Sequence, residues 1–125
     1  MGLYHLEQAP DLEVWRSMTG AERWRVVQHA HNAARIKISK QHAWSHMLVE
    51  DRVLAGDRAV IRALQRLQGE GMSRHNAIHA IADLLIRFMR QQHAFPTPAE
   101  QSQAQRQLNA ALDALTAVPV TMSKD

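Results

Sequence analysis

Apolar residues recur every three to four positions along most of this chain, the spacing that places them on one face of an α-helix. No window alternates apolar and polar residues well enough to predict a β-strand. The sequence therefore predicts an all-α fold, a single small bundle of about five helices. The predicted helices cover about residues 21–35, 36–55, 58–69, 74–92 and 98–118, after a short helix at about 11–18.

Residues that start and stop helices fall between these segments. Thr19-Gly-Ala-Glu22 has the pattern of a capping box, in which the threonine oxygen and the glutamate carboxylate each bond a free backbone N–H group. Thr97 to Glu100 repeats this pattern before the last helix. Gly56 favours a helix end, whereas Asp57 and Ser73 favour new helix starts. The caps and the apolar period therefore agree on where the helices lie.

Length and composition are consistent with one domain over residues 1–125. Apolar residues make up 46% of the chain and aromatic residues only 5%, so the core is expected to be aliphatic. Residues 1–9 show no clear period and Pro119 ends the last helix, so we expect residues 1–9 and 119–125 to be poorly ordered.

Composition also excludes several classes of site. The chain has no cysteine, which excludes disulfides, thiolate metal sites and cysteine nucleophiles. Its N-terminus lacks the basic and apolar regions of a signal peptide, and no apolar run approaches the roughly 18 residues of a membrane span. We therefore expect a cytoplasmic protein.

Two predicted helices carry the same arrangement of histidines and a carboxylate. His42-x3-His46-x3-Glu50 is followed by His75-x3-His79-x3-Asp83. Residues four apart lie one turn above each other on the same helix face, so two such helices side by side would bring four imidazoles together. Imidazole and carboxylate are ligands of transition metals. The sequence therefore predicts a metal-binding protein that holds a divalent ion, zinc or iron, between these two helices.

The two histidine pairs do not occupy equivalent positions. His42 and His46 lie within an apolar stripe, whereas His75 and His79 flank one. The predicted metal ligands are His42, His46, Glu50, His75 and His79, with Asp83 as an optional outer residue. Glu50 is either a ligand or an acceptor that fixes the tautomer of an imidazole. The alternative is that all four histidines are structural and bond carboxylates and backbone carbonyls.

Catalysis is left open by the motifs. A metal ion with an open position would lower the pKa of a bound water, and Glu50 or Asp83 would then be the candidate general base. The His-Glu-x-x-His pattern of zinc proteases is absent, since Ala43-Trp44-Ser45 separate the first histidine pair. The Glu-x-x-His pattern of di-iron bundles is absent too.

A basic segment over residues 23–40 offers a different function. Its cationic residues are Arg23, Arg25, Arg35, Lys37 and Lys40. Together with Trp24 and Trp44 they would suit contacts to phosphates and bases of a nucleic acid. The formal net charge is only +3, however, which is small for a dedicated nucleic-acid module. The apolar stripe of the last helix, with Leu108 and Leu112, would also suit a homodimer.

The segment 42–84, about a third of the chain, resembles a bacterial family of small histidine-rich proteins catalogued as domain of unknown function 1841. The matching elements are His42-x3-His46-x3-Glu50, Gly56-Asp57, Arg66-Leu67, Glu70-Gly71 and the run from Arg74 to Ile81. The family usually has a proline after the Gly-Asp turn, where this chain has Arg58. The resemblance implies a bacterial protein and no particular reaction.

Overall fold

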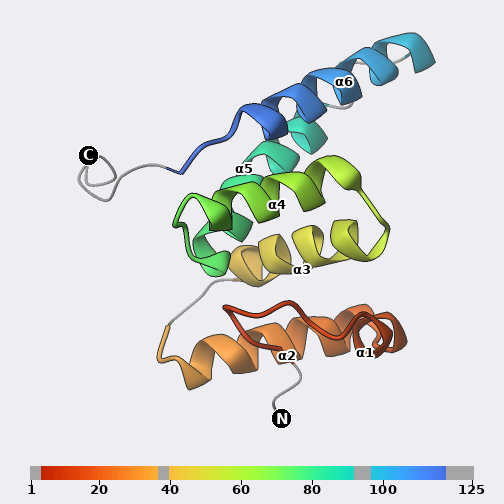
Figure 1. Cartoon of the computed structure of the whole chain (residues 1–125). Coiled ribbons are helices and arrows are strands. Elements are labelled where there is room, and N and C mark those ends of the chain that lie inside the picture. Colours follow the sequence, from red (N-terminus) through yellow and green to blue (C-terminus); the bar gives the residue numbers. More distant parts are fainter. Residues whose placement is uncertain (1–3, 37–39, 92–96, 118–125) are drawn as a thin grey trace.

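The computed structural model describes residues 4–36, 40–91 and 97–117 (Figure 1). Within these ranges the chain forms six helices, and its only extended pairing is an isolated bridge between His5 and Gln8. The helices are α1 (Leu12–Ser17), α2 (Gly20–Ala33), α3 (Lys40–Leu54), α4 (Arg58–Gly69), α5 (Arg74–Gln91) and α6 (Pro98–Ala114). The prediction of a small all-α bundle is confirmed.

The predicted caps start these helices. The Thr19 hydroxyl accepts the backbone N–H of Glu22, whose carboxylate accepts the N–H of Thr19, so the capping box is complete. Asp57 accepts the N–H of Val60 at the start of α4. Gly56 ends α3 with a φ of 78°, in the left-handed region that glycine adopts without steric cost.

The junction between α2 and α3 differs from the predicted continuous helical period. α3 begins at Lys40, not at residue 36, and residues 37–39 lie outside the described ranges. α2 ends in a Schellman motif, in which the N–H of Ile36 bonds the carbonyl of His31 over 2.9 Å. The left-handed position of this motif is taken by Arg35, with a φ of 61°. The chain therefore turns sharply where the apolar period alone predicted a helix.

The helices are stacked in layers (Figure 1). α2 packs on α3, α3 packs on α4 and α5, and α6 covers α4 and α5. None of the helices in the described ranges is long and apolar enough to cross a bilayer.

Two separate groups of buried residues form the interior. The aliphatic core lies among α3, α4, α5 and α6 and contains Val49, Leu67, Ile78, Ile81, Leu85 and Leu112. The aromatic core lies among the N-terminal segment, α1, α2 and α3 and contains Tyr4, Trp15, Val26, Val27, Ala30 and Ala43. The prediction of an aliphatic interior therefore describes only one of the two cores.

The segment from Tyr4 to Gln8 differs from the poorly ordered lead-in that was predicted. Tyr4 is only 3% exposed and packs against Trp15, with ring centroids 5.6 Å apart. The backbone carbonyl of Gln8 accepts a hydrogen bond from Arg74 over 3.4 Å. The segment is therefore fixed by contacts distant in sequence, which a search for local period does not detect. Residues 119–125 lie outside the described ranges.

Candidate metal centre

Five histidines meet where α2, α3 and α5 approach one another. This imidazole cluster consists of His31, His42, His46, His75 and His79. The structure thus brings together the four histidines predicted from the two His-x3-His motifs. It also corrects the prediction of a site between two helices, because His31 comes from a third helix, α2.

The Nε2 atoms of the cluster lie close together. His31 Nε2 is 2.9 Å from His42 Nε2 and 3.2 Å from His75 Nε2. His79 Nε2 is 2.9 Å from His42 Nε2 on the other side. One ligand atom from each of His31, His42, His46 and His75 lies within 4.8 Å of the other three, close enough to hold a metal ion.

The cluster has a buried side and a side that faces solvent. His31 and His46 are 0% exposed. His42, His75 and His79 are partly exposed. Solvent therefore reaches three imidazoles of the cluster, while the deepest two are shielded from water.

The hydrogen bond of His31 to its own helix fixes its tautomer. Its Nδ1 lies 2.8 Å from the backbone carbonyl oxygen of Val27. Because a carbonyl oxygen can only accept, Nδ1 carries the proton and donates it. The Nε2 atom of the neutral ring then has a lone pair, and this lone pair points to His42 and His75.

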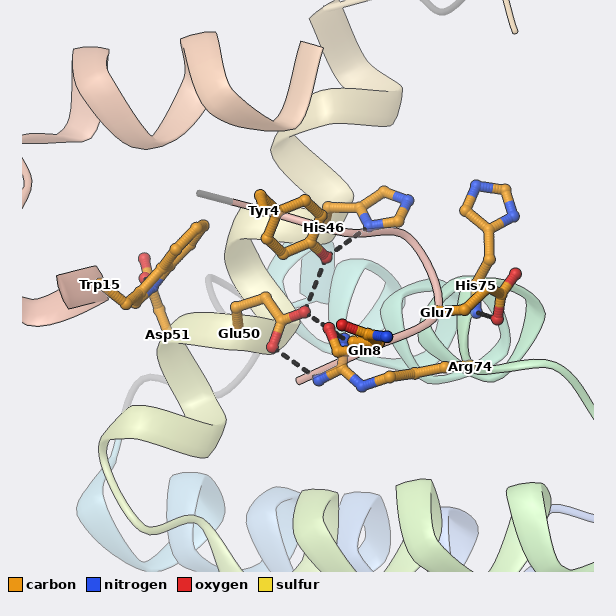
Figure 2. Close-up of polar contacts among 9 residues, drawn as sticks. All are labelled: Tyr4, Glu7, Gln8, Trp15, His46, Glu50, Asp51, Arg74 and His75. Atoms are coloured by element: carbon orange, nitrogen blue, oxygen red, sulfur yellow. Dashed lines mark hydrogen bonds and ion pairs between the residues drawn. The ribbon is translucent and has the colours of Figure 1, made fainter. Parts of the chain in front are cut away.

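A series of hydrogen bonds through Tyr4, Glu50 and Arg74 fixes the tautomer of His46 (Figure 2). Arg74 holds the carboxylate of Glu50 with two bonds of 2.6 and 2.8 Å, and both side chains are buried. The Tyr4 hydroxyl donates to Glu50 Oε2 over 2.6 Å. Since this hydroxyl has one proton, its 2.9 Å contact with His46 Nδ1 requires the imidazole N–H to be the donor.

The tautomer leaves His46 Nε2 as a lone pair in the interior. Among the described residues this atom is buried and has no hydrogen-bond partner. Burial and the Glu50 carboxylate raise the pKa of Tyr4 well above its usual value of 10.0. The Tyr4 hydroxyl therefore keeps the proton that it donates to Glu50. The structure therefore holds the His46 ring with its free nitrogen as an acceptor.

Four imidazoles of the cluster have lowered pKa values, which favours their neutral forms. Burial, followed by the neighbouring imidazoles, lowers the pKa of His46 to about 2 and the pKa values of His42 and His79 to about 4. Burial also lowers the pKa of His31. Imidazole ligates a metal only in its neutral form, so these shifts keep the nitrogens available as ligands.

The two predicted carboxylates lie apart from the imidazole nitrogens. Glu50 is 0% exposed, and Arg74 and Tyr4 occupy its oxygens. Of the two roles left open for Glu50, the structure shows the acceptor that fixes an imidazole tautomer, acting through Tyr4. The same bonds argue against Glu50 as a general base. The side chain of Asp83 is exposed on α5.

The structure describes the side chains of three of the five cationic residues of the predicted basic segment. The Arg23 guanidinium donates to Asp51 Oδ1 over 3.0 Å and to the Trp15 carbonyl over 2.9 Å, and it lies 5.5 Å from the centre of the Trp15 ring. These bonds engage the guanidinium of Arg23 within the chain, and its contact with a phosphate stays a prediction. Arg25 and Arg35 are exposed. Lys37 and the side chain of Lys40 lie outside the described residues.

Three residues of the site were not predicted. His31 lies outside the His-x3-His motifs, and its only signal was a place beside Val27 on the apolar side of its helix. Arg74 was noted in the family pattern without a role. Tyr4 lies in a segment with no period, and nothing in the sequence links it to His46.

No family model, curated protein or solved structure matches this chain. The resemblance of residues 42–84 to the family of unknown function therefore stays a prediction.

Proposed function

We propose that this protein binds one divalent transition-metal ion through Nε2 of His31, His42, His46 and His75, with His79 directly beside the site. The observation that carries the proposal is the buried, unpartnered Nε2 of His46, because a polar atom left without a partner costs about 1–3 kcal/mol. A metal ion at the cluster would remove this cost.

The contacts among the other imidazoles support the same conclusion. His31 Nε2 has one lone pair but two close neighbours, the Nε2 atoms of His42 and His75. A neutral imidazole has only one N–H group, so the His42 proton cannot serve both its contact with His31 and its contact with His79 in linear hydrogen bonds. A cation would accept all these lone pairs at once.

The spacing of the nitrogens suits a small ion. Zinc lies about 2.0–2.1 Å from imidazole nitrogens, which in a tetrahedral site places the nitrogens about 3.3 Å apart. The measured 2.9 and 3.2 Å contacts of His31 are near this value. Neutral imidazole suits zinc, iron, nickel and copper, and zinc or iron is the expectation carried from the sequence.

Metal analysis of the purified chain, expressed without a histidine tag, tests the proposal. We expect one equivalent of a transition metal by mass spectrometry, lost on treatment with a chelator and regained in calorimetric titration. His46→Gln is expected to reduce the affinity at least tenfold. His29→Gln is the matched control, because His29 lies exposed on α2, and it should bind normally.

Two results would contradict the proposal. One is a chain that binds no zinc, iron, nickel or copper in any preparation. The other is an equal loss of affinity in the His46 and His29 variants, since that would place the metal at surface histidines.

The two predicted alternatives need separate measurements. Nucleic-acid binding would depend on the exposed Arg25 and Arg35, and its test is a mobility shift with DNA and RNA that weakens as salt is added. Dimerisation was predicted from the apolar stripe of the last helix, of which Leu108 and Leu112 pack into the aliphatic core of the chain itself. Light scattering on the purified chain measures the oligomeric state directly.

A further inference from the structure

We infer that the metal centre holds a small exogenous anion as an additional ligand. This inference rests on the proposed metal binding and names the ligand class that the site would take. It follows from the charges of the side chains around the imidazole cluster.

The ligand set brings no negative charge to the metal. All five residues of the imidazole cluster are histidines, and an imidazole ligand brings no negative charge, so a divalent ion at the site would keep its full charge. The buried carboxylate nearest in the network, Glu50, is already matched by the guanidinium of Arg74, which is 5% exposed. A divalent charge that is partly buried and uncompensated favours an anion beside it.

The other described carboxylates considered around the imidazole cluster either form hydrogen bonds and ion pairs or are exposed to solvent. Asp51 accepts from Trp15 Nε1 over 2.8 Å and pairs with Arg23. Glu7 is exposed, and its Oε1 accepts the backbone N–H of His75. Asp83 is exposed on α5. A compensating charge would therefore come from solution.

The N-terminal ends of α3 and α5 also favour an anion at the site. His75 is the second residue of α5, and His42 is the third residue of α3, so both lie in first turns. The positive ends of these two helix dipoles add to the charge of the ion.

His79 marks the place where the anion would lie. It belongs to the partly exposed side of the cluster, and its Nε2 contacts His42 Nε2. A metal ion bound to the lone pair of His42 would compete with this contact, and an N–H group of His79 at this position could then donate to an anion on the ion.

Cobalt(II) provides the experiment, because its visible absorption reports changes in its ligands. The cobalt-loaded full chain is titrated with azide and with formate, and with perchlorate at matched ionic strength as a weakly coordinating control. We expect saturable spectral changes with azide and formate and none with perchlorate.

Two variants of one position measure the effect of charge. His79→Glu places a carboxylate beside the ion and is expected to weaken azide binding about tenfold or more, because two charges at this distance interact strongly. His79→Gln keeps a neutral donor and is expected to weaken it only a few-fold. Comparable losses in both variants would overturn the charge argument.

The wild-type titration decides the inference even if either variant fails to fold. Stoichiometric cobalt with a spectrum unchanged by azide and formate would overturn the anion site and leave metal binding intact. A chain that does not take up cobalt or any other transition metal would overturn both proposals.

Discussion

On one side of α3, Val49 packs into the aliphatic core that α3 shares with α4, α5 and α6. On the other side, Ala43 packs into the aromatic core with Trp15 and Val27, and this region also contains the polar chain that runs from His46 to Arg74. The interior of the first region is apolar, and the polar contacts between its helices, from Arg66 to the Leu112 carbonyl and from Arg62 to Asp113, involve no histidine. The second combines aromatic packing with buried polar groups, each of which needs a partner.

This difference indicates which part of the protein depends on pH and on metal ions. Burial of aliphatic side chains does not depend on protons or ions, so the packing of α4, α5 and α6 should be insensitive to pH and metal. The contacts of α2 with α3 and α5 include imidazoles whose protonation changes their interactions. We expect the packing of α1 and α2 on the rest of the protein to weaken as pH or metal concentration falls, while the packing of α4, α5 and α6 stays unchanged.

Acid should have the largest effect. His42 and His79 have folded-state pKa values of about 4 and His46 about 2, all below the 6.5 of a free histidine. From pH 6.5 down to about 4, the unfolded chain binds protons that the folded chain excludes, so stability is lost as pH falls and is fully present above 6.5.

Amide hydrogen exchange at pH 7.5 and 5.0 locates this loss. We expect α2 to lose protection at pH 5.0 while α4 keeps it, with rates corrected for the intrinsic pH dependence of exchange. Equal protection of both helices at the two pH values would show that the imidazole cluster does not hold the α1–α2 layer.

Removing Glu50 should be the most damaging substitution in the polar region. Glu50→Ala leaves the buried Arg74 without its partner, which we expect to cost about 3–5 kcal/mol in the free energy of unfolding. Leu85→Ala in the aliphatic core is the control, with an expected cost of about 2–5 kcal/mol.

The contrast between these two variants lies in metal affinity, measured by calorimetry under conditions in which each variant is folded. Only Glu50→Ala should weaken metal binding, because only Glu50 fixes the orientation of His46 through Tyr4. Similar metal affinities in the two variants would show that metal binding does not depend on the hydrogen bonds from His46 through Tyr4 to Glu50.

Tyr4→Phe should have a smaller effect on stability, about 1–3 kcal/mol for the buried N–H of His46 left without an acceptor, and it should also weaken metal binding. It removes the hydroxyl that joins His46 to Glu50, and loss of such an outer hydrogen bond lowers metal affinity about 10–100-fold. Trp44→Phe, an exposed aromatic change on the same helix as His46, is the control and should leave the affinity unchanged. A Tyr4→Phe chain with wild-type affinity would show that the tautomer of His46 needs no such support.

Arg35→Gly should give the smallest effect, a gain in stability. Arg35 adopts a φ of 61°, where a side chain is strained and glycine is not. We expect a gain of about 0.5–1 kcal/mol in urea unfolding. Arg25→Gly within α2 is the opposite control and should cost about 1 kcal/mol. A loss of stability in Arg35→Gly would mean that the arginine side chain contributes contacts that outweigh the strain.

The sequence by itself determined most of the helices and four of the five histidines of the imidazole cluster. Helical period and caps such as Thr19 and Asp57 depend on residues a few positions apart, so they can be predicted from the sequence without a structure. The same applies to the two His-x3-His motifs, because four-residue spacing places both imidazoles of each pair on one helix face.

Only the tertiary structure decided which groups meet across helices. The contacts of His31 join it to residues 11 and 44 positions away. The contacts of Glu50 with Arg74 and with Tyr4 join residues 24 and 46 positions apart. No local spacing specifies such contacts, because they depend on how α2, α3, α5 and the N-terminal segment pack together. That packing also places the carboxylate of Glu50 on Arg74 and Tyr4, so that it reaches His46 through the Tyr4 hydroxyl.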